Sequence, residues 1–220
     1  VEVDLENMEE SSRWYPGAGI YRPVKLILTG KAAIDPWATS IRTTAFIKGV
    51  DNFGRTKPQA TIDFETQLVG GTASTLLAGS NGQTLANTSD NAFEGLACVI
   101  DVVNDKDFFE TPYLYRVRTR LYRNHKLIDE VITPFGIRTI EVSKDGGFKL
   151  NGVSRKLQGV CLHHDLGPLG AAVSKAALIR QIRLMKDMGC DAIRTAHNMP
   201  SEMQMQVCDS MGMMVMAESF

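Results

Sequence analysis

The sequence CDAIRTAHNMP, residues 190–200, decides the fold class of the last third of this chain. Its first part, Asp191–Arg194, has the length and apolar character of a short buried strand. The stretch before it, Ser174–Met188, has apolar residues at helical spacing and is followed by Gly189, a common residue after a helix. A strand that directly follows a helix is typical of α/β architecture.

The same alternation continues on both sides of this stretch. Downstream, Ser201 and Gln204 form a capping-box pattern that opens a second helix, and Gly212 closes it. The apolar run Met213–Ala217 predicts the next strand, and Gln158–Leu162 predicts the strand before. Strands that alternate with helices predict a parallel sheet with right-handed crossover connections.

The sequence has a different character before residue 140. Short stretches of alternating apolar and polar residues, separated by turn signals, predict a β-sandwich there. Gly70–Asn91 is rich in Gly, Ser, Thr and Asn, which predicts mainly loops. Further on, the pair Asn151–Gly152 between two apolar stretches predicts a β-hairpin. The clearest predicted sandwich strands are Ser40–Ile47, Ala60–Glu65 and Tyr113–Tyr122.

The composition excludes several classes of protein. The chain has 220 residues and is 44% hydrophobic, which suffices for a packed core and excludes a disordered protein. With 24 basic and 25 acidic side chains the net charge is −1, so no basic field favours nucleic acid or an anionic membrane. The four cysteines lack a CxxC pair and predict buried free thiols; they are Cys98, Cys161, Cys190 and Cys208.

Polar residues follow each of the three strands predicted in the last third. In parallel α/β barrels the carboxyl ends of the strands build the active site, so these residues are candidates for function. One metal ion held by His163, Asp165 and His197 is one reading, and hydrogen bonding to sugar hydroxyls is the other. A retaining glycosidase needs two carboxylates roughly 5 Å apart, and Glu218 has no evident partner. The candidates are His163, His164 and Asp165, then His197 and Asn198, and then Glu218.

Several segments resemble glycoside hydrolase family 2, in the same order along the chain. Residues 194–200 (RTAHNMP) resemble the signature Arg-Thr-Ser-His-Asn-x-Pro of that family, with Ala196 in place of serine. Residues 208–218 are similar to the segment after this signature. The other matching segments are RWYPGAGIYR at residues 13–22, FGIR at 135–138, FKLNG at 148–152 and LQGV at 157–160.

The resemblance implies a mainly β protein with an α/β part. Residues 1–30 are expected to be the end of an N-terminal sugar-binding jelly-roll domain, and residues 31–140 an immunoglobulin-like β-sandwich. Residues 141–220 are expected to form the first, incomplete part of a (β/α)8 TIM barrel. We therefore expect the chain to be a fragment of a longer enzyme.

The resemblance also implies the chemistry of a retaining β-glycosidase, with double displacement on terminal β-galactosides. β-Glucuronidases and β-mannosidases of the family share the scaffold and stay open as alternatives. The acid/base and nucleophile glutamates are expected beyond Phe220, so no catalytic residue is expected within the chain. Among the residues present, His163 and His197 match histidines that bind sugar hydroxyls, and Arg194 matches an arginine that orients the nucleophile. Asn198, Asp165 and Glu218 are expected at the same rim as further substrate-binding residues.

Expectations about partners follow from the same resemblance. A β-galactoside is the expected carbohydrate partner, and the longer protein is expected to be a homo-oligomer. The lack of a long apolar run predicts a soluble chain, and its compartment, cytoplasm or periplasm, stays open. No nucleic acid, membrane, metal or cofactor is expected for residues 1–220, and a divalent cation elsewhere in the longer protein stays open. Two other classes also stay open: a non-catalytic carbohydrate-binding or interaction module, and a barrel metallohydrolase.

Overall fold

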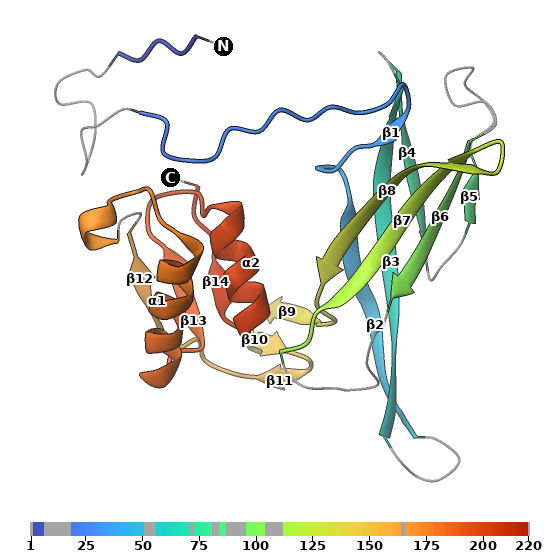
Figure 1. Cartoon of the computed structure of the whole chain (residues 1–220). Helices are drawn as coiled ribbons and strands as arrows, with labels where there is room; N and C mark the ends of the chain where they lie inside the picture. The colour runs from blue at the N-terminus through green and yellow to red at the C-terminus, as the bar shows by residue number, and fades with distance from the viewer. Residues whose placement is uncertain are drawn as a thin grey trace. The chain divides into compact units, whose positions relative to one another are not determined.

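The computed structural model describes residues 2–6, 19–50, 56–70, 73–80, 84–86, 96–103, 112–163 and 166–219. The chain divides into two compact units, shown in Figure 1. The sandwich unit comprises residues 28–157 and 209–212, and the α/β unit comprises residues 1–27, 158–208 and 213–220. Most of the RWYPGAGIYR segment, up to Ala18, lies outside the described residues.

The sandwich unit contains two four-stranded antiparallel sheets. The first consists of β1 (Ala33–Ile34), β2 (Ser40–Val50), β3 (Thr56–Gly70) and β4 (Ala73–Ser80), with β3 at its centre. The second consists of β5 (Thr84–Ala86), β6 (Leu96–Val103), β7 (Tyr115–Arg123) and β8 (Lys126–Phe135), in this order. Residues from both sheets form one buried core, so the predicted β-sandwich is confirmed.

The core of the sandwich follows from alternation along β7. Val117, Thr119 and Leu121 are fully buried, and the arginines between them point to the opposite face, as the sequence predicts. A hydrogen bond also joins the two sheets, since the N–H of Ile34 donates to Oδ2 of Asp129 at 2.8 Å. The first sheet contributes Ile34, Ile62, Phe64 and Leu68 to the core.

Among the described residues of Gly70–Asn91, the prediction that loops dominate is wrong, and the rest of this stretch lies outside the described residues. Residues 73–80 form β4, which pairs antiparallel with β3 from Ala73↔Gly70 to Ser80↔Asp63. Residues 84–86 form β5, which pairs with β6. Small and polar residues have low strand propensity, but a long neighbouring strand supplies a hydrogen-bond ladder that overrides this preference.

A third, smaller sheet contains the predicted hairpin. Its strands are β9 (Ile140–Ser143), β10 (Gly147–Leu150) and β11 (Val153–Ser154), in the order β11-β10-β9. The turn residues Asn151 and Gly152 have φ of 53° and 75°. Both angles lie in the left-handed region that a tight two-residue hairpin turn requires, which explains the Asn-Gly pair.

The α/β unit is built on the parallel sheet β12-β13-β14, as the sequence predicts. Helix α1 connects the first two strands and α2 connects the last two (Figure 1). Apolar residues of both helices are buried. Ile193 and Thr195 are buried, whereas Cys161 and Met216, on the opposite face, are exposed. The elements are β12 (Gly159–Leu162), α1 (Lys175–Asp187), β13 (Ala192–Thr195), α2 (Glu202–Met211) and β14 (Met214–Met216), with a short 3-10 helix at Gly167–Leu169.

Local signals begin and end both helices where the sequence predicts. The Ser174 hydroxyl accepts the N–H of Ala177 at 3.3 Å at the start of α1. The Ser201 hydroxyl accepts the N–H of Gln204 at 3.1 Å at the start of α2. Gly189 and Gly212 follow the two helices with φ of 89° and 65°.

The cysteines depart in part from the expected buried thiols. Cys98 and Cys208 are buried, and burial raises the pKa of the Cys98 thiol to about 11. Cys161 is exposed and Cys190 is half-buried, and all four are free thiols. Cys161 lies on the face of the parallel sheet opposite Ile193 and Thr195, which explains its exposure. Within the described part of the chain, no helix has the length and hydropathy needed to cross a membrane.

We predict that Leu121→Ala lowers the free energy of unfolding by about 2–5 kcal/mol, because the lost side chain leaves a cavity in the sandwich core. Urea unfolding of the purified chain measures this change. Leu127→Ala is the matched control, since Leu127 is 46% exposed on the next strand and its truncation is expected to cost less than about 0.5 kcal/mol. Equal losses in the two variants would contradict the observed burial.

Candidate active site

The structure brings together polar residues that follow the three parallel strands. His163 follows β12, His197 follows β13 and Glu218 follows β14. Parallel neighbours end at the same edge of a sheet, so residues from distant parts of the sequence meet there. The rings of His163 and His197 lie edge to face, with centroids 5.5 Å apart and an interplanar angle of 69°.

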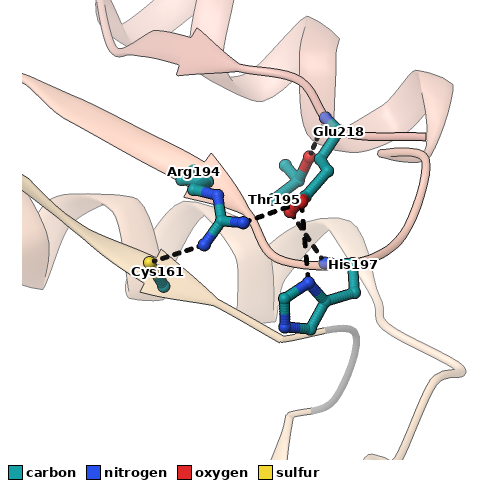
Figure 2. A network of polar contacts seen from close by, with 5 residues as sticks. All are labelled: Cys161, Arg194, Thr195, His197 and Glu218. Atoms are coloured by element: carbon teal, nitrogen blue, oxygen red, sulfur yellow. Dashed lines mark hydrogen bonds and ion pairs between the residues drawn. The ribbon is translucent and has the colours of Figure 1, made fainter. Parts of the chain in front are cut away.

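The carboxylate of Glu218 is the centre of the cluster, as Figure 2 shows. Its Oε1 accepts a hydrogen bond from Nη2 of Arg194 at 2.7 Å, in an ion pair between partly exposed side chains. Its Oε2 accepts the backbone N–H of His197 at 3.1 Å. Nδ1 of His197 lies 3.6 Å from Oε1. Both carboxylate oxygens therefore contact donors from the end of β13.

Two further contacts fix this arrangement. The backbone N–H of Glu218 donates to Oγ1 of Thr195 at 3.0 Å, and Thr195 is only 4% exposed. Nη1 of Arg194 lies 3.6 Å from Sγ of Cys161. Cys161 and Arg194 are register partners on neighbouring parallel strands, so their side chains point to the same face of the sheet.

The backbone at His197 adopts an unusual conformation. Its φ is 62°, in the left-handed region that favours glycine, and a side chain there costs roughly 1–2 kcal/mol. Residues held in this conformation by the surrounding structure are concentrated at functional sites. The hydrogen bond from the His197 N–H to Glu218 helps to hold this turn.

The electrostatics of the cluster favour an ionised Glu218. The backbone N–H of His197 is the main cause of a lowered pKa of the Glu218 carboxyl, and Arg194 adds to it, against the opposing effect of desolvation. The sulfur of Cys161 and the carboxylate of Glu218 both raise the pKa of Arg194. Arg194 and Glu218 are therefore both charged near neutral pH.

The other predicted site residues have different positions. His163 is exposed and directly follows β12, and Asn198 is half-buried and directly follows the turn at His197. Asp165, together with His164, lies outside the described residues. Within the described residues, no three His, Cys, Asp or Glu side chains are grouped as they would be around a metal ion.

Sequence reasoning did not single out Thr195 or Cys161 as members of this cluster. The hydroxyl oxygen of Thr195 accepts a hydrogen bond from the backbone N–H of Glu218, which is 23 positions away in the sequence. Cys161 lies beside Arg194 only because β12 and β13 pair in one register. The period-two alternation of strands could have placed Cys161 and His163 on one face, but not Cys161 beside Arg194.

The chemistry of the cluster fits recognition of a polar, uncharged ligand. The imidazoles of His163 and His197 offer both donors and acceptors, as sugar hydroxyls require, and the amide of Asn198 follows directly in the sequence. Glu218 is the only carboxylate among the described residues that directly follow the three strands. A glycosidase needs two carboxylates with different roles, so the described cluster by itself lacks the catalytic pair.

Two models of one family match most of the chain. The model of Glycosyl hydrolases family 2 matches residues 55–138, and the model of Glycosyl hydrolases family 2, TIM barrel domain, matches residues 140–220. The solved structure of a glycosyl hydrolase family 2 member from Bacteroides cellulosilyticus aligns with a TM-score of 0.72. It is 29% identical, and the alignment covers 94% of this chain and 29% of that one.

Curated relatives show the same similarity over nearly the whole chain. The β-galactosidase BoGH2A of Bacteroides ovatus is 38% identical over 233 residues, which cover 99% of this chain and 26% of the relative. A β-glucuronidase of Bacteroides fragilis is 29% identical over 209 residues, which cover 91% of this chain and 30% of the relative. The chain therefore spans about a quarter to a third of the length of these relatives.

These matches agree with the parallel strands and the polar residues at their ends. The chain belongs to glycosyl hydrolase family 2.

We predict that the free energy of unfolding of the variant His197→Gly is about 1 kcal/mol higher than that of His197→Ala, because glycine adopts φ near 62° without strain. The φ of His163 is not positive, so the free energy of unfolding of His163→Gly is expected to be roughly 0.5 kcal/mol lower than that of His163→Ala. Urea unfolding of His197→Gly, His197→Ala, His163→Gly and His163→Ala measures the two differences. The same sign at both positions would contradict the left-handed turn.

We also predict that acid removes the stabilisation that Glu218 supplies. Because the pKa of Glu218 is lowered in the folded chain, its stabilisation is complete above the ordinary pKa of about 4.5 and is lost as the pH falls below it. The melting temperature of the wild type should therefore exceed that of Glu218→Gln at pH 7 by more than at pH 3. Glu202→Gln, which removes an equally charged but exposed side chain, is the control. A difference independent of pH would contradict the lowered pKa.

Proposed function

We propose that the chain is part of a retaining β-glycosidase that hydrolyses terminal β-galactosides by double displacement. The observation that carries this proposal is the cluster of His163, His197 and Arg194 at the strand ends of a family 2 chain. The 38% identity to a β-galactosidase, along 99% of the chain, favours β-galactosides among the substrates of the family.

The proposal includes the architecture of the longer protein. A parallel sheet whose successive strands are connected through α1 and α2 fits the first units of a (β/α)8 barrel. We propose that residues 141–220 begin this barrel, that residues 31–140 are an immunoglobulin-like domain, and that residues 1–30 end a sugar-binding domain. Assembly of the longer protein into a homo-oligomer stays a prediction.

Each site residue has a proposed role. His163, His197, Asn198 and Asp165 would hydrogen-bond sugar hydroxyls, with bonds that strengthen in the transition state. Arg194 would orient the nucleophilic glutamate through a charge-assisted hydrogen bond and keep it ionised. Its contacts with Glu218 and Cys161 use only part of the several donors on a guanidinium group, so a second carboxylate has donors to bind.

The catalytic pair is proposed to lie outside residues 1–220. In double displacement, one glutamate attacks the anomeric carbon, while the other protonates the leaving oxygen and later activates water. Glu218, paired with Arg194 and held ionised near neutral pH, is poorly suited to donate that proton.

A second candidate substrate is a β-glucuronide. A β-glucuronidase that is 29% identical over 91% of the chain supports it. A glucuronide differs from a galactoside in carrying a carboxylate, which requires a cationic partner in the site. Arg194 is the cation of the described cluster, and its contacts with Glu218 and with the proposed nucleophilic glutamate would leave few of its donors for a substrate carboxylate. The β-galactoside therefore remains the favoured substrate.

We predict that the purified 220-residue chain hydrolyses neither p-nitrophenyl β-galactoside nor p-nitrophenyl β-glucuronide above a no-protein control, because it lacks the catalytic pair. The protein encoded with its downstream sequence is expected to hydrolyse the galactoside, with kcat/KM roughly tenfold or more above that for the glucuronide. Release of p-nitrophenolate, followed by absorbance, measures both.

Hydrolysis by the 220-residue chain alone would overturn the proposed position of the catalytic glutamates. A preference of the longer protein for the glucuronide would overturn the proposed substrate. Absence of activity on both substrates in a folded longer protein would overturn both candidate substrates.

A further inference from the structure

The role of Glu218 can be inferred from its four contacts. Sugar-binding carboxylates accept hydrogen bonds from hydroxyls, so they need an oxygen that protein donors leave accessible. In Glu218, Oε1 accepts Nη2 of Arg194 at 2.7 Å and Oε2 accepts the N–H of His197 at 3.1 Å. The side chain is only 22% exposed. Its contacts therefore favour a role toward the protein over one toward a ligand.

The first partner, His197, needs an external support for its backbone. Its φ of 62° is disfavoured for a residue with a side chain, and this conformation directs the imidazole toward the ring of His163. The hydrogen bond from its N–H to Glu218 stabilises the turn that sets this direction. Loss of the bond would let the imidazole leave the geometry that it has beside His163.

The second partner, Arg194, has a long and flexible side chain. It is 39% exposed, so packing alone does not hold its guanidinium group. Oε1 of Glu218 on one side and Sγ of Cys161 on the other contact two different nitrogens and orient the plane of the group. An arginine that must orient a second carboxylate depends on such an orientation.

Glu218, which follows β14, is itself held in place by Thr195 at the end of the neighbouring strand β13. The N–H of Glu218 donates to Oγ1 of the buried Thr195. The carboxylate of Glu218 accepts hydrogen bonds from Arg194 and from the backbone of His197. The segment after β14 thus donates a hydrogen bond to the end of β13 and accepts hydrogen bonds from it (Figure 2). A rigid support of this kind is what a precisely aligned site requires.

We propose that Glu218 is a positioning residue, which holds the guanidinium of Arg194 and the backbone of His197 so that both face the substrate in the required orientation. This inference rests on the proposed glycosidase function. It departs from the expectation that Glu218 binds sugar directly. Arg194 and His197 act most strongly in the transition state, so the loss of Glu218 lowers kcat more than it raises KM.

The test uses the longer protein and the variant Glu218→Gln. Glutamine keeps the shape of the side chain but offers one acceptor oxygen in place of two, so it cannot serve both partners. We expect kcat on p-nitrophenyl β-galactoside to fall roughly tenfold or more, with KM within about threefold of the wild type. Glu202→Gln, which removes an exposed carboxylate paired with Lys25, is the matched control and is expected to keep both constants.

Hydrogen exchange at single amides gives a readout that does not depend on activity. The His197 amide is expected to exchange roughly tenfold or more faster in Glu218→Gln, because its acceptor is weakened. The Ala196 amide, which donates to the Leu162 carbonyl at 3.0 Å, is the internal reference and should keep its protection. Its protection also shows that the variant remains folded.

A second variant, Thr195→Val, covers the case in which Glu218→Gln does not fold. Valine has the shape of threonine but lacks the hydroxyl that accepts the Glu218 N–H, so it loosens Glu218 without changing the carboxylate. A fall in kcat in the same direction, together with faster exchange at His197, is expected.

The outcomes separate the alternatives. A rise in KM of roughly tenfold with unchanged kcat would show that Glu218 binds sugar and would overturn the proposal. Unchanged exchange at His197 would overturn it as well. Faster exchange of the His197 amide in Glu218→Gln, in a longer protein that hydrolyses no glycoside, would show that Glu218 stabilises the His197 backbone and would overturn the proposed function.

Discussion

The parallel register of β12, β13 and β14 is the constraint on which the α/β unit depends. Gly159 lies opposite Ala192, and Cys161 lies opposite Arg194. A Cβ at position 159 would lie 1.8 Å from the carbonyl oxygen of Ala192, so only glycine permits this approach of the two strands. A shift by one residue would turn Arg194 to the opposite face of the sheet, away from Glu218.

This register also determines how charge is balanced at the strand ends. Arg194 and Glu218 come from neighbouring strands and neutralise each other at 2.7 Å. Because their side chains are 39% and 22% exposed, solvent screens the pair and its contribution to stability is small. Its main consequence is geometric, since the carboxylate also binds the backbone at His197. A partly exposed ion pair thus orders a site more than it stabilises a fold.

The balance of charge limits the chemistry that this edge performs by itself. An ionised, paired carboxylate accepts hydrogen bonds but is a poor proton donor near neutral pH. The imidazoles of His163 and His197 and the amide of Asn198 remain as groups that suit hydroxyl recognition. The sandwich unit has its own core around β3 and β7, and the five residues of the cluster drawn in Figure 2 belong to the α/β unit. Residues of one unit therefore make up the whole described cluster.

The sequence by itself determined the elements whose causes are local. Ser174 and Ser201 begin the helices, Gly189 and Gly212 follow them, and Asn151–Gly152 makes the hairpin turn, because each effect acts within a few residues. The order of strands and helices followed from periodicity, which predicted the three parallel strands and the polar residues at their ends.

Only the tertiary structure decided what depends on pairing between distant segments. Strands β4 and β5 form in a stretch with loop-like composition because β3 and β6 offer them hydrogen-bond partners. The contact of Glu218 with Arg194 and His197 joins residues more than 20 positions apart, and the left-handed turn at His197 persists within these contacts. Local propensity carries no information on such contacts, since they arise from the register of the sheet and the end of each strand.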